Sequence, residues 1–216
     1  RQLHEQGIEL GQRQVDIYAG LNAMILLLEL NRYARGRDDL EEIVFYPSGK
    51  SQHRKFSNQL LRVINYSNSI TTGVFNKLLK PYLGNANLNG AYLCSMYLDF
   101  VNFSHTCLKD AYLNHTCLTE TNFSHANLSY ADLSYSDLTY TDLSYADLSY
   151  ADLSHANLSH AFLSDTDLSG TNLRGTNLSS ANFSGEFGDV CWNENTIWEG
   201  VYGLERAINV PEALKK

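Results

Sequence analysis

The sequence predicts a mainly β fold, a solenoid of short repeated units, from two observations. Between residues 83 and 183 a Leu or Phe recurs at every fifth position, 21 times in succession. Two residues before most of these positions lies a small side chain, usually Ala, Ser or Thr. A fixed short period is typical of a solenoid, in which each unit buries its apolar face by stacking on its neighbours.

Each five-residue unit is expected to be a very short strand followed by a corner. Ala131 and Leu133 lie two positions apart, so an extended backbone points both side chains inward and Asp132 outward. The next two residues must turn the chain, because the following small residue and Leu again face inward. Glycine, which adopts positive φ at low cost, stands at this corner in four units, namely Gly90, Gly170, Gly175 and Gly185.

The unit reads A-(D/N)-L-(S/T)-x, and residues 81–189 resemble the pentapeptide-repeat family. The resemblance implies a right-handed quadrilateral parallel β-helix with four units, or twenty residues, per coil. The 21 apolar positions then make about five coils, and at about 4.8 Å per coil the shaft is roughly 25 Å long. Phe103, Phe123 and Phe183 differ by multiples of twenty, so we expect them on one face.

Residues 1–80 are predicted to form a helical N-terminal domain. Apolar residues at helical spacing within 12–35 indicate a buried helix, and a capping box at Asp38 and Glu41 begins a second. Two further apolar stripes precede Pro81. We expect this domain to cap the exposed edge of the first coil, and the alternative is a docking domain with its own partner.

Residues 190–216 are predicted to form a short C-terminal cap. The repeat breaks at Gly185, and Thr196 and Trp198 return to its register. Trp192 and Trp198 are large enough to fill the open end of a coil, and we expect a terminal helix over 203–216 interrupted at Pro211. The resemblance implies an alternative role for residues 190–216, an end-to-end dimer interface like that of gyrase-inhibiting family members, so monomer and dimer both stay open.

Charge is distributed unevenly along the chain, whose total is −8. Residues 1–80 carry 11 basic and 8 acidic residues, whereas residues 81–189 carry 2 basic and 12 acidic residues, a net of −10. An acidic shaft argues against direct nucleic-acid binding, because phosphate groups need Lys and Arg to neutralise them. It favours a basic protein partner, or solubility alone.

The four cysteines show no metal-binding or redox spacing. Cys107 and Cys117 lie half a coil apart, on opposite faces, so they cannot form a disulfide within one molecule. We therefore expect reduced thiols and a cytoplasmic protein. The longest apolar stretch, Ala23 to Leu28, is too short to span a bilayer and no signal peptide is visible. A module tethered to a membrane by a segment preceding Arg1 is a third hypothesis.

The corners in the middle of the shaft gather aromatic and imidazole side chains. These consecutive corners are expected to form a belt that winds about twice around the shaft. Tyr gives large contact area at low entropic cost, so the belt is a candidate interaction surface. The structural alternative is stacking between coils, with Tyr130 over Tyr150 and Tyr135 between His115 and His155. The belt consists of His125, Tyr130, Tyr135, Tyr140, Tyr145, Tyr150, His155 and His160.

The position after the small residue carries a band of carboxylates around the same coils. This band comprises Asp132, Asp137, Asp142, Asp147 and Asp152, with Asp167 further along. Some pentapeptide-repeat proteins resemble duplex DNA in shape and charge and occupy the DNA site of a type II topoisomerase such as gyrase. The band makes that role an alternative function for this chain. Neutral exchange of Asp and Asn at a solvent-exposed position of the repeat would produce the same mixture of Asp and Asn without any function.

No constellation in the sequence predicts catalysis, a cofactor or a bound metal. His105 and His125 are expected to stack, but Asp110 and Glu120 fall on other faces, and a closed zinc site needs about four ligands. A filled shaft offers neither the concave pocket nor the oxyanion site of a catalytic triad. The sequence therefore predicts a non-catalytic scaffold or regulatory module that binds another protein through its shaft.

Overall fold

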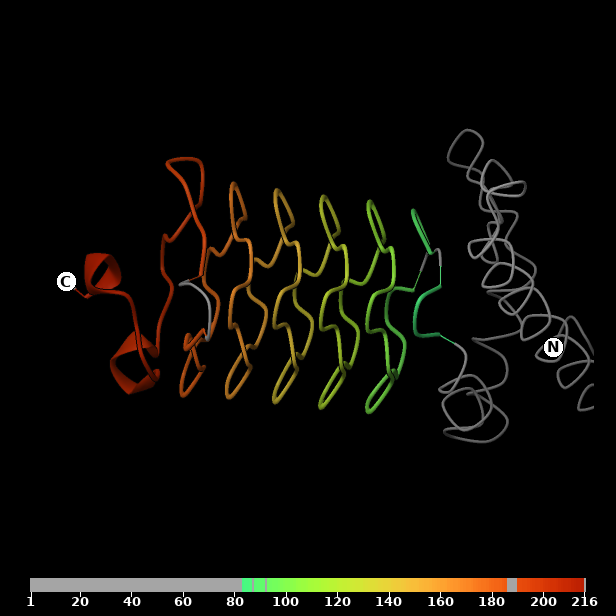
Figure 1. Cartoon of the computed structure of the whole chain (residues 1–216), viewed down its shortest axis with the longest axis horizontal. Coiled ribbons are helices and arrows are strands. Elements are labelled where there is room, and N and C mark those ends of the chain that lie inside the picture. Colours follow the sequence, from blue (N-terminus) through green and yellow to red (C-terminus); the bar gives the residue numbers. More distant parts are fainter. Residues whose placement is uncertain (1–82, 87, 92, 186–189, 216) are drawn as a thin grey trace, which may run out of the picture.

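The computed structural model describes residues 83–86, 88–91, 93–185 and 190–215, which wind into a shaft of stacked coils (Figure 1). Residues twenty apart pair through parallel backbone bridges, from Tyr97 with Cys117 to Phe162 with Asn182. The 100 residues from 83 to 182 therefore make five coils. The predicted solenoid with four units per coil is confirmed. The helical domain expected in residues 1–80 lies outside the described residues.

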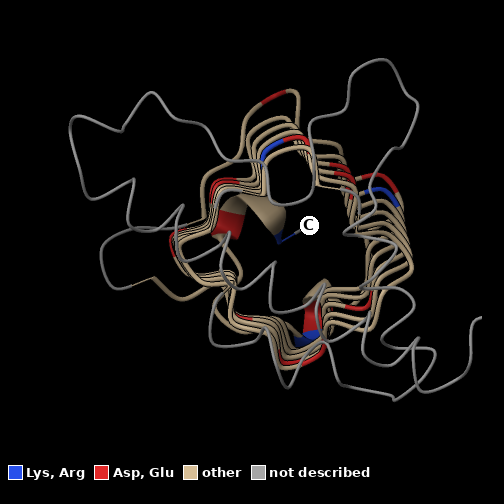
Figure 2. Ribbon diagram, turned by 90° about the vertical axis from the view of Figure 1, so that its right-hand side faces the viewer, with Lys and Arg blue, Asp and Glu red and all other residues tan. Residues whose placement is uncertain are grey.

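The bridges form four ladders along the shaft, and the coils have a four-sided outline when viewed along the axis (Figure 2). We name each face after its Asp in the coil that begins at residue 132. The Asp132 face contains Tyr112, Asp132, Asp152, Asn172 and Ile197. The Asp137 face contains Tyr97, Cys117, Asp137, Asn157, Asn177 and Tyr202. The Asp142 face contains Asn102, Asn122, Asp142, Phe162, Asn182 and Ile208, and the Asp147 face contains Cys107, Asn127, Asp147, Asp167 and Cys191.

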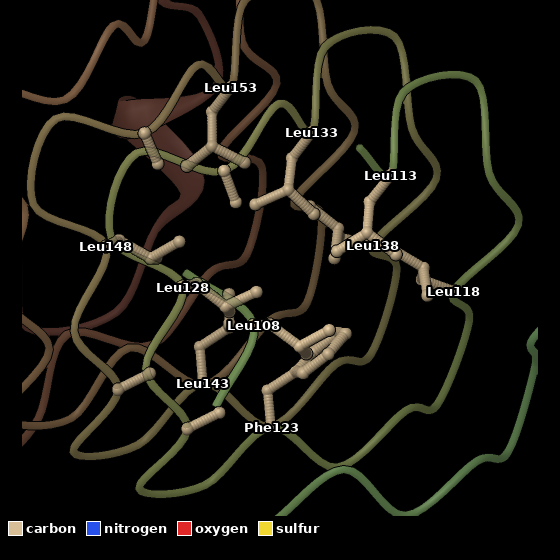
Figure 3. Packing of buried hydrophobic residues seen from close by; sticks show 14 of the residues in the cluster. Leu108, Leu113, Leu118, Phe123, Leu128, Leu133, Leu138, Leu143, Leu148 and Leu153 are labelled. Carbon is tan, nitrogen blue, oxygen red and sulfur yellow. The ribbon is translucent and has the colours of Figure 1, made fainter. Parts of the chain in front are cut away.

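The core is the column of Leu and Phe side chains that points to the shaft axis (Figure 3). Every fifth residue from Leu83 to Phe183 is at most 3% exposed. Phe103 and Phe123 stack with ring centroids 5.1 Å apart. Phe183 belongs to the same column, because its neighbour Asn182 lies on the ladder that contains Asn102 and Asn122. The expectation that these three Phe side chains share a face is confirmed.

The small inward position is polar in many units, and its hydroxyl groups have buried acceptors. Thr141 Oγ1 donates to the carbonyl of Leu118 at 3.0 Å, and Thr171 Oγ1 donates to the carbonyl of Leu148 at 2.7 Å. The same contact with a Leu 23 residues earlier is made by Thr106, Thr116, Thr121, Thr166 and Thr176. A hydrogen bond compensates a buried hydroxyl for the loss of its contact with water. Thr can therefore occupy this buried position as well as Ala does.

The Asp or Asn position completes the hydrogen bonding of each unit. In the unit from Ala131 to Tyr135, four backbone N–H groups donate to carbonyls of the same or adjacent coils. The remaining one, of Ser134, donates to Asp132 Oδ1 at 3.0 Å. The carbonyl acceptors of the other four belong to Leu128, Ala111, Asp152 and Ser154. A carboxylate and an amide oxygen accept this bond equally well, which explains why Asp and Asn interchange at this position.

Two units with Cys at that position take the acceptor from the preceding coil. In the unit of Cys107, the N–H of Lys109 donates to Asn89 Oδ1 at 3.1 Å. In the unit of Cys117, the N–H of Thr119 donates to Asp99 Oδ1 at 3.0 Å. The substitution of Cys for Asp or Asn is thus compensated by a side chain twenty residues before the donor.

The ladder continues past residue 189, where we expected the β-helix to end. Asp167 pairs with Cys191, Asn172 with Ile197, Asn177 with Tyr202 and Asn182 with Ile208, at separations of 24 to 26 residues. The extra residues lie between the paired positions, so the last coil is longer than the others. The expected return to register is confirmed for Thr196, which is buried and donates from Oγ1 to the carbonyl of Leu168 at 2.9 Å.

The prediction of a terminal helix over 203–216 is wrong for the described residues 203–215. They contain two 3₁₀ helices of three residues each, η4 over Leu204–Arg206 and η5 over Glu212–Leu214. Left-handed φ values at Gly203 and Asn209 interrupt a continuous helix, as does Pro211. Between η4 and η5 the backbone pairing of Ile208 with Asn182 continues the ladder.

The C-terminal segment lies across the end of the shaft in both views (Figures 1 and 2). Val210 is buried, and Leu204 and Leu214 pack against the core. Trp192 and Trp198 also pack against the core and meet edge to face with ring centroids 6.1 Å apart. These apolar contacts pack the C-terminal segment against the core of the shaft.

Replacing Leu143 by Ala is expected to lower the free energy of unfolding by about 2–5 kcal/mol, because its fully buried side chain leaves a cavity between two coils. Urea denaturation would measure the loss. Ser149→Ala, outside the core, is the control and is expected to change stability by less than about 0.5 kcal/mol. A loss below about 1 kcal/mol for Leu143→Ala would contradict the packing of the core.

Replacing Asp142 by Asn is expected to leave stability within about 0.5 kcal/mol of the native value, whereas Asp142→Ala is expected to cost about 1–2 kcal/mol. The reason is that Asn retains the side-chain oxygen that accepts the N–H of Ser144 at 3.0 Å, and Ala does not. Thermal unfolding of the two variants would compare them. Equal losses for both would show that the charge, and not the turn, matters for stability.

Candidate functional site

All eight belt residues lie at corners with left-handed backbone. Their φ values fall between 57° and 60°. The four corners carry two belt residues each, since each pair differs by twenty residues. The pairs are His125 with Tyr145, Tyr130 with Tyr150, Tyr135 with His155 and Tyr140 with His160. The predicted belt around two coils therefore corresponds to a ring pair at every corner of the shaft.

The rings at each corner stack along the shaft axis. Tyr130 and Tyr150 have ring centroids 5.2 Å apart. Tyr135 lies between His115 and His155, at 5.1 and 4.9 Å, with interplanar angles below 20°. Both of these stacks were predicted and are confirmed. The remaining stacks are His105–His125–Tyr145 and Tyr140–His160, with centroids 4.6 to 4.8 Å apart.

Stacking leaves much of each belt tyrosine exposed to solvent. The exposed fractions of Tyr130, Tyr135, Tyr140, Tyr145 and Tyr150 are 53, 55, 49, 38 and 50%. A left-handed backbone costs roughly 1–2 kcal/mol at a residue with a Cβ, so ring contacts between coils help to offset a real penalty. The rings thus have a structural role, and their outer edges remain available for contact with another molecule.

The carboxylate band is distributed over all four faces. Asp132, Asp137, Asp142 and Asp147 belong to one coil and lie one to a face, as Figure 2 also indicates for acidic residues in general. Each of these side chains is half-buried, and its Oδ1 accepts the backbone N–H two residues later. One oxygen of each carboxylate is therefore committed to the fold. Its charge is not required there, because Asn does the same at equivalent positions.

The charge density of the shaft is lower than that of duplex DNA. Residues 83–185 contain ten acidic and two basic residues, a net of −8 over about five coils. At about 4.8 Å per coil this is one net charge per roughly 3 Å, whereas duplex DNA carries one per about 1.7 Å. The shaft thus matches DNA in the sign of its charge and reaches about half of its linear density.

The described residues contain no set of three His, Cys, Asp or Glu side chains that could hold a metal ion. His105 and His125 stack as predicted, with ring planes 3° apart. Parallel rings direct their nitrogen lone pairs along parallel planes and not towards a common point. This pair therefore does not form the beginning of a zinc site.

The described residues include all four cysteines of the chain. None of the four cysteines forms a disulfide within the described residues, and Cys107 and Cys117 lie on different ladders, as expected from their spacing. Burial raises the pKa of the Cys117 thiol, and the nearby carboxylates of Asp99 and Asp137 raise it further. A raised pKa keeps this thiol protonated near neutral pH and poorly nucleophilic.

A pocket of about 320 Å³ lies at the C-terminal end and is formed by Leu204, Glu205, Ala207, Asn209, Val210 and Lys215. This lining contains no paired nucleophile and base, so it suggests no catalytic site. In the described ranges, no helix is long and apolar enough to cross a membrane. Neither feature adds to the belt and the carboxylate band as candidates for function.

One contact at the belt was not predicted from the sequence. The Lys109 ammonium lies 5.4 Å from the centroid of the Tyr130 ring. This distance is within the range of a cation–π interaction. The signal was present in the sequence, since Lys109 precedes the corner that lies one coil before Tyr130.

Replacing Gly170 by Ala is expected to destabilise the shaft by more than the roughly 1–2 kcal/mol that a left-handed backbone costs a residue with a Cβ. Gly170 has φ of +69°, and a Cβ built there would lie 2.7 Å from the Tyr150 ring. In a Tyr150→Asn background the ring is absent, so the cost should fall. A double-mutant cycle by urea denaturation would measure the coupling, and additive losses would contradict this ring placement.

The family profile for pentapeptide repeats matches this chain in eight copies, over residues 82–114, 106–144 and 146–185. A comparison with curated protein sequences gives no match. Three solved structures among those that match are each similar over part of the chain. A pentapeptide repeat protein from the thylakoid lumen of Arabidopsis thaliana is 27% identical, over 52% of this chain and 69% of its own, with a TM-score of 0.30.

The second is a pentapeptide repeat protein from Nostoc Pcc 7120, 29% identical over 53% of this chain and 82% of its own, with a TM-score of 0.30. The third is full-length QnrB1, a plasmid-mediated fluoroquinolone resistance protein, 18% identical over 58% of this chain and 79% of its own, with a TM-score of 0.32. The repeat matches overlap the residues that form the twenty-residue ladder. The chain is therefore a pentapeptide-repeat protein, with a right-handed β-helix solenoid formed by the repeats of residues 82–185.

Proposed function

We propose that this protein is a non-catalytic scaffold or regulatory module that binds another protein through the belt and the carboxylate band. The observation that carries the proposal is the exposure of the belt: eight consecutive corners bear Tyr or His rings, and the tyrosines stay 38 to 55% exposed although they are stacked. A folded protein leaves few large aromatic side chains so exposed without a use for them, and Tyr is enriched at interfaces.

The carboxylate band supports the same proposal. Stability does not require Asp at these positions, because Asn makes the same turn contact in the units of Asn122, Asn127 and Asn157. Five successive units from Asp132 to Asp152 nevertheless carry Asp. Negative charge concentrated beside exposed rings favours a basic protein surface as partner and disfavours nucleic acid.

The alternative function, mimicry of DNA in binding to a type II topoisomerase such as gyrase, draws on the same band. Its support is weaker, because the linear charge density is about half that of the duplex and the Asp residues are concentrated in little more than one coil. Inhibition of supercoiling that disappears in a variant with Asn at positions 132, 142 and 152 would favour this alternative over the scaffold.

We also propose that the C-terminal end caps the shaft of a monomer and does not form an end-to-end dimer. Leu204, Val210 and Leu214 pack towards the core, whereas the exposed side chains include those of Glu205, Arg206, Glu212 and the apolar residue Ile208. A polar outer face is typical of a terminal capping unit. Light scattering during size-exclusion chromatography would test this, and a dimer that dissociates when residues 204–215 are altered would overturn it.

Capture of partners from a lysate of the source cells tests the scaffold proposal. The native protein is expected to retain a partner that is lost when the five belt tyrosines, from Tyr130 to Tyr150, are replaced by Asn. Asn tolerates a left-handed backbone and removes the aromatic surface. A variant with His at the same five positions keeps stackable rings and controls for folding. If the native protein captures nothing above the level of the Asn variant, the proposal fails.

A further inference from the structure

We propose that the partner docks on one edge of the shaft, the corner of Tyr130 and Tyr150 with the Asp132 and Asp147 faces on its two sides, and that it contributes a helix rich in Arg and Lys. We call this the Tyr130 edge. The inference rests on the proposed function and names the surface and the chemistry of its partner.

The two tyrosines form the apolar centre of the edge. Their rings stack at 5.2 Å, and each is about half exposed. The stack ends at Gly170, which has no side chain beyond the backbone and lies against the Tyr150 ring. The rings are held in place by this stacking, so contact with a partner would cost little side-chain entropy.

Four carboxylates lie on the two faces that meet at this corner. Asp132 and Asp152 pair in the ladder of one face, and Asp147 and Asp167 pair in the ladder of the other. Each Oδ1 accepts a backbone N–H, and in the described part of the chain none of the four carboxylates is in a salt bridge. The outer oxygens are thus available to a cation from another molecule.

No other corner has as many carboxylates at the ladder positions beside it. The opposite corner, Tyr140 and His160, lies between Asp137 with Asn157 and Asp142 with Phe162, so it has two. The corner of Tyr135 and the corner of Tyr145 each have three. Asp165 stands at the latter corner, but its Oδ2 is buried. The Tyr130 edge therefore has four carboxylates beside it, against three or two at the other corners.

The chain itself places a cation against this edge. The Lys109 ammonium lies 5.4 Å from the Tyr130 ring centroid, so the ring face accepts a positive charge from its own chain. This contact is independent of the four carboxylates and indicates the chemistry of an external group. Arg suits the edge best, because its planar guanidinium donates two N–H groups to a carboxylate while its alkyl stem packs against the exposed edges of the stacked rings.

The spacing of the carboxylates fits a helix. Paired carboxylates on one face are one coil apart, about 4.8 Å. Side chains at i and i+4 on a helix are about 5–6 Å apart at Cβ, and long Arg and Lys side chains absorb the small difference. A helix lying along the edge could therefore place successive cations between the two faces.

Binding of a designed peptide tests the inference. The probe is a fluorescein-labelled, Ala-rich helical peptide with Arg at i, i+4, i+8 and i+12, titrated with the full chain in about 50 mM salt and followed by anisotropy. The edge variant carries Asn at positions 132, 147, 152 and 167. The matched control loses four charges from the opposite side, through Asp99→Asn, Glu120→Gln, Asp137→Asn and Asp142→Asn. Asn keeps each turn contact, so these variants should fold.

The edge variant is expected to bind the peptide about tenfold more weakly than the native protein, and the control less than about threefold more weakly. Tyr130→Asn with Tyr150→Asn should weaken binding more than Tyr140→Asn with His160→Asn. Equal weakening by the edge and control variants, or no binding by the native protein, would overturn the inference. Partner capture that depends on the belt tyrosines would then still support the scaffold, so the two failures are distinguishable.

Discussion

The hydrogen bonds between coils are the constraint on which the rest of this structure depends. In most five-residue units the N–H groups at the Leu, corner and Asp or Asn positions donate to carbonyls of neighbouring coils, and a turn within the chain takes a fourth. This pattern fixes the repeat at twenty residues and leaves one N–H, which an Asp or Asn oxygen accepts. Whatever side chain stands at one position then lies beside the side chain twenty residues away.

That alignment converts sequence into columns with separate physical roles. The Leu and Thr columns are fixed by the core, since they are buried and hydrogen-bonded. The corner column demands a left-handed backbone but allows any side chain that can meet its neighbours. The column of Asp and Asn residues requires a side-chain oxygen, but the side chain may be charged or neutral. Aromatic content and negative charge are thus the two properties of the shaft that function can set without changing the fold.

Much of this arrangement could be predicted from the sequence, because residues whose numbers differ by twenty fall in the same column. The stacks of Tyr130 on Tyr150 and of Tyr135 between two His rings followed from it and are confirmed. The roles of Asn89 and Asp99 could not be predicted, since each replaces an oxygen missing one coil later. The long last coil was also missed, because inserted residues change the separation from 20 to as many as 26.

The arrangement of side chains in columns also determines which charges of the shaft a partner can contact. A rigid partner on one side meets one corner and parts of two faces, so it contacts only a fraction of the carboxylates in a coil. Total charge is therefore a poor guide to affinity, and the local arrangement decides. Coulombic attraction falls with distance and is screened over roughly 8–10 Å in physiological salt, so charges on the far side of the shaft contribute little. The edge where exposed rings and four carboxylates coincide is consequently where a basic partner gains most.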